Sequence, residues 1–177
     1  MIIIPFEHGE DARIRELKKF DIPNLETIIQ DLDIQKNFFK LESSEDYFES
    51  AVAWNNAKPR DYYGFVIECN KHSKSIQFPA GYIHLIKDDS ENKAQVDFFI
   101  DKKYRNRHLA SSALQIISNF AFQNLHLDTL EARINPNNEA VKRVLLKNGF
   151  EPYDQGNYDL EKDSTNEEFE VYAAFND

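Results

Sequence analysis

Cysteine and glycine are scarce in this chain of 177 residues. Cys69 is the single cysteine, so an internal disulfide is excluded and a thiolate zinc cluster has no second thiol. Glycine is absent from 82–148, which excludes a glycine-rich nucleotide loop there. The sequence also has no HExxH, GxSxG or GxxxxGK[ST] motif, and we expect no metal site.

Long apolar runs are missing as well. The run near the start, Met1 to Ile4, is too short for a signal peptide or a membrane span, so we expect a cytoplasmic protein without a membrane partner. The net charge of −10 argues against nucleic-acid binding, which needs a basic surface. It suits a cationic substrate, although acids that merely keep the surface soluble explain it equally well.

The chain is rich in large apolar side chains. Hydrophobic residues make up 41% of it and aromatic residues 13%, enough to bury a core without a partner. No repeat or linker divides the sequence. We therefore expect one domain over 1–177.

Hydrophobic periodicity predicts an α/β (α+β) fold with helices on both faces of a mixed, mostly antiparallel sheet of about 6–7 strands. Polar loops separate the middle strands and indicate a meander. A helical crossover then makes the strands on either side of it a central parallel pair. The expected strands are Asp11–Leu17, Tyr62–Cys69, Ile76–Lys87, Ala94–Asp101, Leu127–Ile134, Phe150–Tyr158 and Phe169–Phe175.

Helix signals are clear at several points. Asp21 is expected to cap a helix that places Leu25, Ile28, Ile29 and Leu32 on one face. A long helix is expected over Leu109–His126. Asn135 and Pro136 suit the start of the last helix, and Gly149 suits a left-handed end that returns Phe150 onto Leu145.

The turn before the long helix is basic. Four cationic side chains fall within the six residues 102–107 of an otherwise acidic chain. A helix start offers free N–H groups, so the turn can bind a phosphate. A basic loop that only offsets acidic neighbours is the alternative.

Three ordered motifs resemble the GNAT superfamily, particularly its ribosomal-protein N-acetyltransferase-like (RimJ/RimL-like) branch. They are Arg105–Ala110 (RNRHLA) after a strand, Glu131–Ala140 (EARINPNNEA), and Lys147–Phe150 (KNGF) at a helix end. Each motif alone is weak, but their order and spacing are specific, and the likeness covers nearly the whole chain.

The resemblance implies acetyl-CoA as co-substrate. It implies that the backbones of Phe98, Phe99 and Ile100 pair with the pantetheine arm, and that Asn138 contacts the cofactor. The motif that begins with Arg105 would hold the diphosphate through the amides of Asn106, Arg107, His108, Leu109 and Ala110.

The sequence departs from the family pattern at three positions. His108 replaces a glycine, so its Cβ can crowd the diphosphate or change the backbone angle. Val141 stands where many members of this branch carry serine. Leu145 stands where other branches carry the tyrosine that protonates the leaving thiolate.

A base must take the proton of the incoming amine. Asp97 and Glu131, on the two parallel strands, are the candidates, with His84 a third. Each has an ordinary alternative: Asp97 as a surface hydrogen-bond partner, Glu131 neutralised by Arg133, and His84 as a structural histidine.

The sequence thus predicts direct acetyl transfer to a primary amine of a small molecule or peptide, such as a polyamine or protein N-terminus. Two alternatives to this function remain: a GNAT-like protein that binds CoA without catalysis, and a protein of similar architecture that binds no CoA. The sequence leaves open the oligomeric state, with a homodimer among the possibilities.

Overall fold

The computed structural model describes residues 7–8, 11–38, 46–69, 78–153 and 169–177. Within them, one eight-stranded sheet has the order β1-β2-β3-β4-β5-β6-β8-β7. The strands are β1 (Glu7–His8), β2 (Ala12–Glu16), β3 (Tyr62–Cys69), β4 (Gly81–Asp88), β5 (Lys93–Ile100), β6 (Thr129–Ile134), β7 (Glu151–Pro152) and β8 (Glu170–Phe175). The expected strand residues 76–77 and 154–158 lie outside the described residues.

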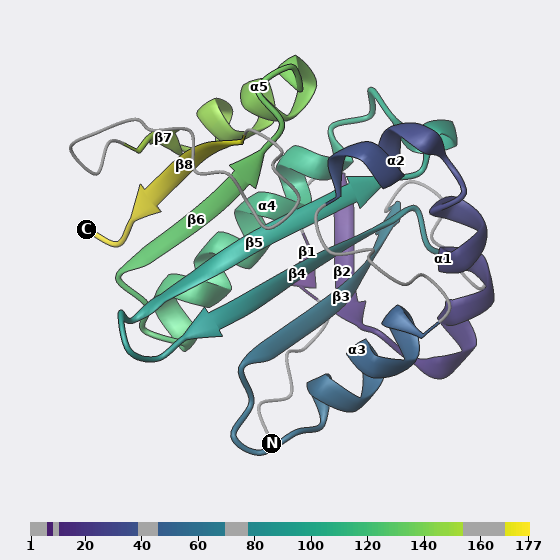
Figure 1. The fold of residues 1–177 in the computed structure, drawn as a ribbon, viewed down its shortest axis with the longest axis horizontal. Helices are drawn as coiled ribbons and strands as arrows, with labels where there is room; N and C mark the ends of the chain where they lie inside the picture. The colour runs from purple at the N-terminus through teal and green to yellow at the C-terminus, as the bar shows by residue number, and fades with distance from the viewer. Residues whose placement is uncertain (1–6, 9–10, 39–45, 70–77, 154–168) are drawn as a thin grey trace.

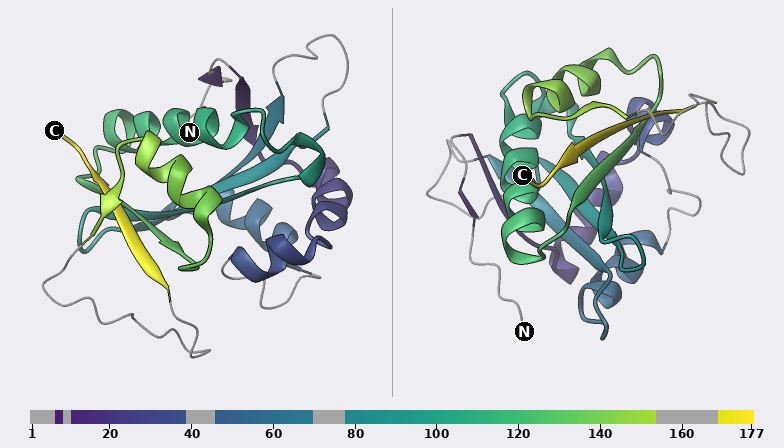
Figure 2. Two further views of the ribbon diagram at one scale, coloured as in Figure 1. Left: turned by 90° about the horizontal axis from the view of Figure 1, so that it is seen from above. Right: turned by 90° about the vertical axis from the view of Figure 1, so that its left-hand side faces the viewer.

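Helices cover both faces of this sheet, as predicted (Figures 1 and 2). One face carries α1 (Ile22–Ile28), α2 (Leu32–Asn37) and α3 (Tyr47–Asn55), and the other carries α4 (Leu109–Asn119) and α5 (Glu139–Lys147). A π-helical turn, Phe120–Asn124, continues α4. None of the described helices has the length and apolar character needed to cross a bilayer.

The predicted parallel pair is β5 and β6. These strands pair at only three positions, from Lys93 opposite Thr129 to Gln95 opposite Glu131. β5 stays paired with β4 up to Ile100, and β6 stays paired with β8 up to Ile134. The two central strands therefore separate after Gln95 while each keeps its outer neighbour, so the sheet opens in its middle.

Alternation along the strands divides the core into two layers. Residues such as Ile83, Leu85 and Val96 pack with α4, whereas Tyr82 and Phe99 pack with the α1–α3 layer. Phe150 is buried with Leu145 and donates its N–H to the Leu145 carbonyl (3.1 Å), with Gly149 at φ +80°. The predicted left-handed end of this helix is confirmed.

Two boundaries of the predicted helices were wrong. The helix after Asp21 breaks in two, because Asp31 begins α2 by accepting a hydrogen bond from the Asp33 N–H (3.0 Å). Leu32 is consequently 77% exposed instead of buried. The last helix begins at Glu139, capped by Asn138 and not by Asn135.

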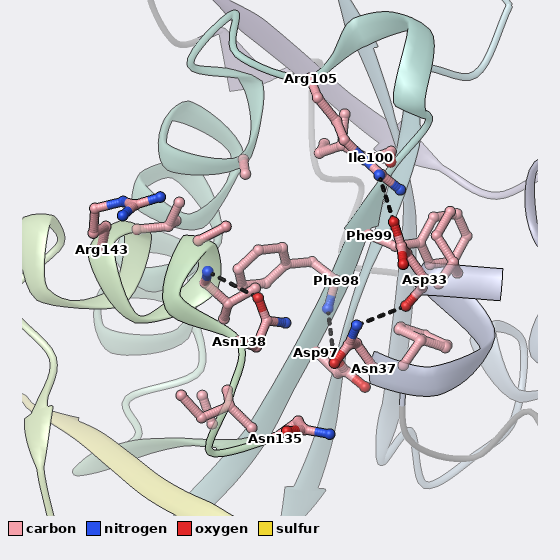
Figure 3. A pocket seen from close by; sticks show the side chains of 18 of the residues that line it. Asp33, Asn37, Asp97, Phe98, Phe99, Ile100, Arg105, Asn135, Asn138 and Arg143 are labelled. Carbon is pink, nitrogen blue, oxygen red and sulfur yellow. Dashed lines mark hydrogen bonds and ion pairs between the residues drawn. The ribbon is translucent and has the colours of Figure 1, made fainter. Parts of the chain in front are cut away.

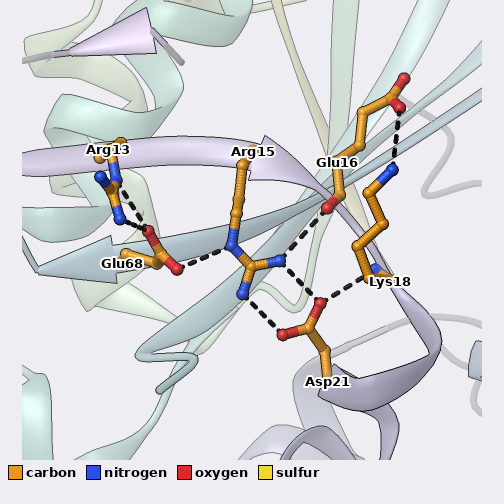
Figure 4. A network of polar contacts seen from close by, with 6 residues as sticks. All are labelled: Arg13, Arg15, Glu16, Lys18, Asp21 and Glu68. Atoms are coloured by element: carbon orange, nitrogen blue, oxygen red, sulfur yellow. Dashed lines mark hydrogen bonds and ion pairs between the residues drawn. The ribbon is translucent and has the colours of Figure 1, made fainter. Parts of the chain in front are cut away.

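An ionic network around the buried carboxylates of Glu68 and Asp21, shown in Figure 4, ties the first helical layer to the sheet. Glu68 accepts from the Nε atoms of both Arg13 and Arg15 (2.7 Å each). Arg15 also makes a bidentate pair with Asp21 (2.6 and 2.7 Å). Burial works against the charge of Arg15, but its bonds to Asp21 and Glu68 raise its pKa above the ordinary value. Asp21 therefore anchors the start of α1 to β2, the role that replaces its predicted helix cap.

Candidate functional site

A cleft of about 800 Å³ lies where β5 and β6 separate (Figure 3). Its walls are the free part of β5, the turn before α4, the β6–α5 connection and α2. The structure brings most of the predicted site residues to this cleft. Those that line it are Asp97, Phe98, Phe99, Ile100, Arg105, Asn106, His108, Leu109, Ala110 and Asn138.

The start of α4 presents backbone donors to the cleft. The first bond of the helix runs from the Ser112 N–H to the His108 carbonyl (3.0 Å), and within the described residues the side chain of His108, which precedes α4, makes no capping hydrogen bond. The preceding N–H groups, those of Leu109 to Ser111, therefore lack a partner within the helix. An uncapped N-terminus of this kind favours an anion.

His108 takes the backbone conformation that a glycine would take. Its φ is +60° and its ψ is 11°, in the left-handed region, and Asn106 has φ +60° as well. The sequence left two consequences open at position 108: a changed backbone angle or a crowded diphosphate site. The backbone angle is not changed. The imidazole remains, exposed at the rim of the cleft.

The side chains of the basic turn have other partners. Arg105 donates to the Ile100 carbonyl (3.2 Å) and to Asp31 (2.9 Å), so it braces the turn against α2. Arg107 lies over the Tyr104 ring at 5.6 Å and is not among the residues that line the cleft. Anion binding in this turn therefore depends on the main chain more than on these two guanidinium groups.

Asn138 faces the cleft from the opposite wall (Figure 3). Its Oδ1 accepts the Val141 N–H (3.3 Å), which caps α5. With the oxygen so engaged, the amide orientation is set and the Nδ2 donors are available to a ligand. Val141 lines the cleft, whereas Leu145 is fully buried in the core.

The free edge of β5 supplies further donors. The Asp101 backbone N–H donates to the Ala80 carbonyl, just before β4 (2.8 Å), and backbone direction alternates along a strand. The N–H and C=O groups of Phe98 and Ile100 therefore point away from β4, toward the missing part of β6. In the structure the Phe98 N–H is met by the Oδ1 of Asp97 (2.8 Å).

The two predicted bases are placed differently. Asp97 lines the main cleft and is half-buried. Glu131 lines a second hollow and binds Lys93 (3.2 Å), whose pKa is raised by Glu91 and then by Glu131. The structure thus brings Asp97, and not Glu131, to the residues around α4.

Helix α2 forms a wall that the sequence did not predict. Its side chains reach the cleft because Asp31 restarts the helix toward β5. The added lining residues of this wall are Asp33, Ile34, Lys36, Asn37 and Phe38. On the opposite wall, Arg143 and Lys147 of α5 add exposed cations. The sequence places Arg143 and Lys147 four residues apart, on one face of a helix. Whether that face points to the cleft depends on where the Asn138 cap begins the helix.

A sheet that opens at its parallel pair beside an uncapped helix defines the GNAT class of fold. The acetyltransferase (GNAT) domain model matches residues 12–151, and the chain belongs to this family. Acetyl-CoA is the co-substrate of GNAT enzymes.

Individual proteins that are similar to this chain are named as acetyltransferases or as members of the GNAT family. The probable N-acetyltransferase YjcK of Bacillus subtilis is 28% identical over 83 residues, which cover 47% of this chain and 46% of that protein. The match thus spans about half the length of this curated relative. A GNAT-family acetyltransferase from Bacillus anthracis has a TM-score of 0.76 at 21% identity, with 97% of this chain and 99% of that one covered. RimJ of Mycobacterium smegmatis, solved with a CoA disulfide, has a TM-score of 0.71 at 17% identity, with coverages of 93% and 81%.

The residues present fit coenzyme A. The uncapped N-terminus of α4 suits a diphosphate, and Arg143 and Lys147 add positive charge along the same cleft. The unpaired edge of β5 and the Asn138 amide face each other across the gap, a spacing that suits an amide-bearing arm.

Proposed function

We propose that the protein transfers the acetyl group of acetyl-CoA to a primary amine by direct attack. The observation that carries this proposal is the early separation of β5 from β6, which leaves an unpaired strand edge next to the uncapped start of α4. Acetyl-CoA supplies the activated acyl group. The chain's own residues would bind acetyl-CoA, orient the amine and remove a proton from it.

Each predicted cofactor contact has a role in this proposal. The main chain of Asn106 to Ala110 would hold the diphosphate, with Arg105 bracing the turn. The edge of Phe98 to Ile100 and the Asn138 amide would hold the pantetheine arm. The family fold would direct backbone N–H groups at the oxygen that gains charge during attack.

Asp97 is the base that we propose. The acceptor arrives as an ammonium ion, and the Asp97 carboxylate would take one proton from it, directly or through a water molecule. The free amine would then form the C–N bond while the C–S bond breaks and the thiolate leaves. The second proton of the attacking nitrogen would pass through water to the leaving thiolate, since the buried Leu145 offers no acidic group. Glu131, bound to Lys93, is the less favoured base.

The acceptor is a primary amine of a peptide N-terminus, a polyamine or a small molecule. A single cysteine and the use of acetyl-CoA are in keeping with a cytoplasmic enzyme. A second function, CoA binding without catalysis, is favoured by Leu145 and by His108 at the glycine position.

Two measurements separate these functions. A thermal shift with acetyl-CoA and with CoA tests binding, since a ligand of the native state raises the melting temperature. Thiol release across a panel of amines tests transfer. A shift with amine-dependent release supports the proposal, a shift without release supports the binding function, and no shift at millimolar ligand contradicts both.

A further inference from the structure

The first turn of α4 and the end of α5 are joined beside the cleft. Nδ2 of Asn148, the residue that follows α5, donates to Oγ of Ser111 (3.0 Å) and to the Val144 carbonyl (2.8 Å). Ser111 belongs to the first turn of α4 and lines the cleft. The contact therefore fixes the position of a hydroxyl group next to the turn that is proposed to hold the diphosphate.

The direction of this hydrogen bond leaves the Ser111 proton for a ligand. An amide NH2 group only donates, so the Ser111 oxygen is the acceptor and its own proton points elsewhere. Among the residues that the structure describes, Asn148 is the partner of this hydroxyl and no acceptor for its proton is found. Ser111 thus adds a side-chain donor to the N–H groups that lack a helical partner at the start of α4.

Two cations of α5 lie on the same side of the cleft. Arg143 and Lys147 are four residues apart, so their side chains share one face of the helix, and both line the cleft. Within the described part of the chain neither has an acidic partner, whereas the neighbouring Lys142 pairs with Glu139 (3.3 Å) and Glu170 (3.1 Å). The positive charge of Arg143 and Lys147 is therefore available to a ligand.

Charge is unevenly distributed between the walls of the cleft. Among its described lining residues, the carboxylates are those of Asp33 and Asp97, which belong to the α2 and β5 walls. Figure 3 shows Arg143 on the opposite wall, the one that carries Asn138. The α5 wall thus has cations without acidic neighbours in the cleft, which favours an anionic group there.

CoA carries a second anionic group besides its diphosphate. The ribose of CoA bears the diphosphate on one side and a phosphomonoester on its 3′ oxygen, so a single sugar ring separates the two groups. Ser111 directly follows Ala110, the last residue of the turn that is proposed to hold the diphosphate. A second phosphoryl site beside the first is therefore within reach of the same ligand.

We propose that Ser111, Arg143 and Lys147 form a subsite for the 3′-phosphomonoester of CoA. The Ser111 hydroxyl donates to one phosphoryl oxygen, and the two cations balance the charge of the group, which is about −2 at neutral pH. The inference rests on the proposed function insofar as the diphosphate binds at the start of α4.

Calorimetry with CoA and with dephospho-CoA, which lacks the 3′-phosphate, tests this subsite. We expect the wild type to bind CoA at least about tenfold more tightly, the factor that one charge-assisted hydrogen bond represents. Ser111→Ala, and the double variant Arg143→Gln/Lys147→Gln, should each weaken CoA binding and leave dephospho-CoA binding unchanged. Lys142→Gln removes a cation of the same helix that does not line the cleft, and this control should change neither affinity.

The possible results are distinct. Equal affinity of the wild type for the two ligands would overturn the subsite and leave the proposed function intact. Equal weakening of both ligands in the variants would place these side chains at the diphosphate and would also overturn it. Absence of binding by either ligand would contradict the proposed function as well. No amine is present, so failure of acetyl transfer is a separate outcome.

The 31P signal of the bound phosphomonoester gives a second test, which does not depend on affinity. This group loses its second proton with a pKa of about 6, and neighbouring cations favour the dianion. With saturated wild type, the midpoint of the titration should lie below that of free CoA. In Arg143→Gln/Lys147→Gln it should return toward the free value. A wild-type midpoint equal to that of free CoA would overturn the proposal.

Discussion

The Asp97 carboxylate accepts the backbone N–H of Phe98 (2.8 Å) where β5 has lost its parallel neighbour. This carboxylate occupies the place of a strand partner. A carbonyl of the pantetheine arm that pairs with Phe98 would compete for the same N–H and release that oxygen of Asp97. If Asp97 is the base, as we propose, cofactor binding and the freedom of that base would be linked through one backbone donor.

Replacement of Asp97 by alanine should separate binding from turnover. We expect kcat with the best amine of the panel to fall at least about 100-fold, the usual contribution of a positioned base. The acetyl-CoA Kd should stay the same or fall, because a competitor for the Phe98 N–H is removed. Calorimetry gives Kd and thiol release gives kcat. Glu131→Gln is the matched control and should retain turnover within about twofold. Equal losses in the two variants would argue against Asp97.

Replacement of His108 by glycine should strengthen the diphosphate site. A left-handed residue with a Cβ costs about 1–2 kcal/mol, and the greater freedom of an unfolded glycine offsets about 0.4–1 of this. We expect a stability gain of up to about 1.6 kcal/mol with tighter CoA binding, measured by urea unfolding and calorimetry. Asn106→Gly, at the same φ of +60°, is the control. Its gain should be smaller, since asparagine tolerates this conformation. Weaker CoA binding in His108→Gly would show instead that the imidazole contacts the diphosphate.

Two substitutions of Asn138 should separate its capping of α5 from its proposed contact with the cofactor. Serine keeps a cap for α5 but lacks the amide donors, so Asn138→Ser should retain stability and weaken acetyl-CoA binding several-fold. Asn138→Ala should weaken binding equally and lose about 1 kcal/mol as well. Thermal unfolding with and without ligand measures both effects. Unchanged affinity in the two variants would remove Asn138 from the cofactor site.

The network in Figure 4 makes a prediction about stability. Glu68 is 2% exposed and accepts from both Arg13 and Arg15, so Glu68→Gln removes a buried carboxylate that the two guanidinium groups share and should cost about 3 kcal/mol. Glu16 is 29% exposed and pairs with Arg60 and Lys18. Glu16→Gln is the control and should cost less than about 1 kcal/mol in the same urea titration. Similar costs would contradict a buried role for the network.

Much of the fold followed from the sequence because local rules agree with the packing. The polar loops of the meander and the crossover helix fixed the parallel pair, and Gly149 fixed the end of α5. The family motifs placed the turn from Arg105 to Ala110 and Asn138 at one cleft. These signals are short-range or recur as ordered motifs, so they can be read without coordinates.

Other features depended on which of several possible hydrogen-bond partners a residue meets in the fold, and the sequence alone does not decide this. Asn135 and Asn138 are both good helix caps, and the one that bonds Val141 was decided by the path out of β6. Asp21 looked like a cap but pairs with Arg15, six positions earlier. Hydrogen bonds join the buried side chains of Tyr82, Tyr62, Tyr47 and His84 from three elements, and no local pattern in the sequence predicts them.

A crystal structure of the protein with CoA tests the central claim most directly. We predict diphosphate oxygens at about 3 Å from backbone nitrogens between Asn106 and Ala110, with the pantetheine arm along Phe98 to Ile100. The Asp97 carboxylate should then have left the Phe98 N–H. An empty turn at the start of α4, or CoA bound outside the gap between β5 and β6, would contradict the account.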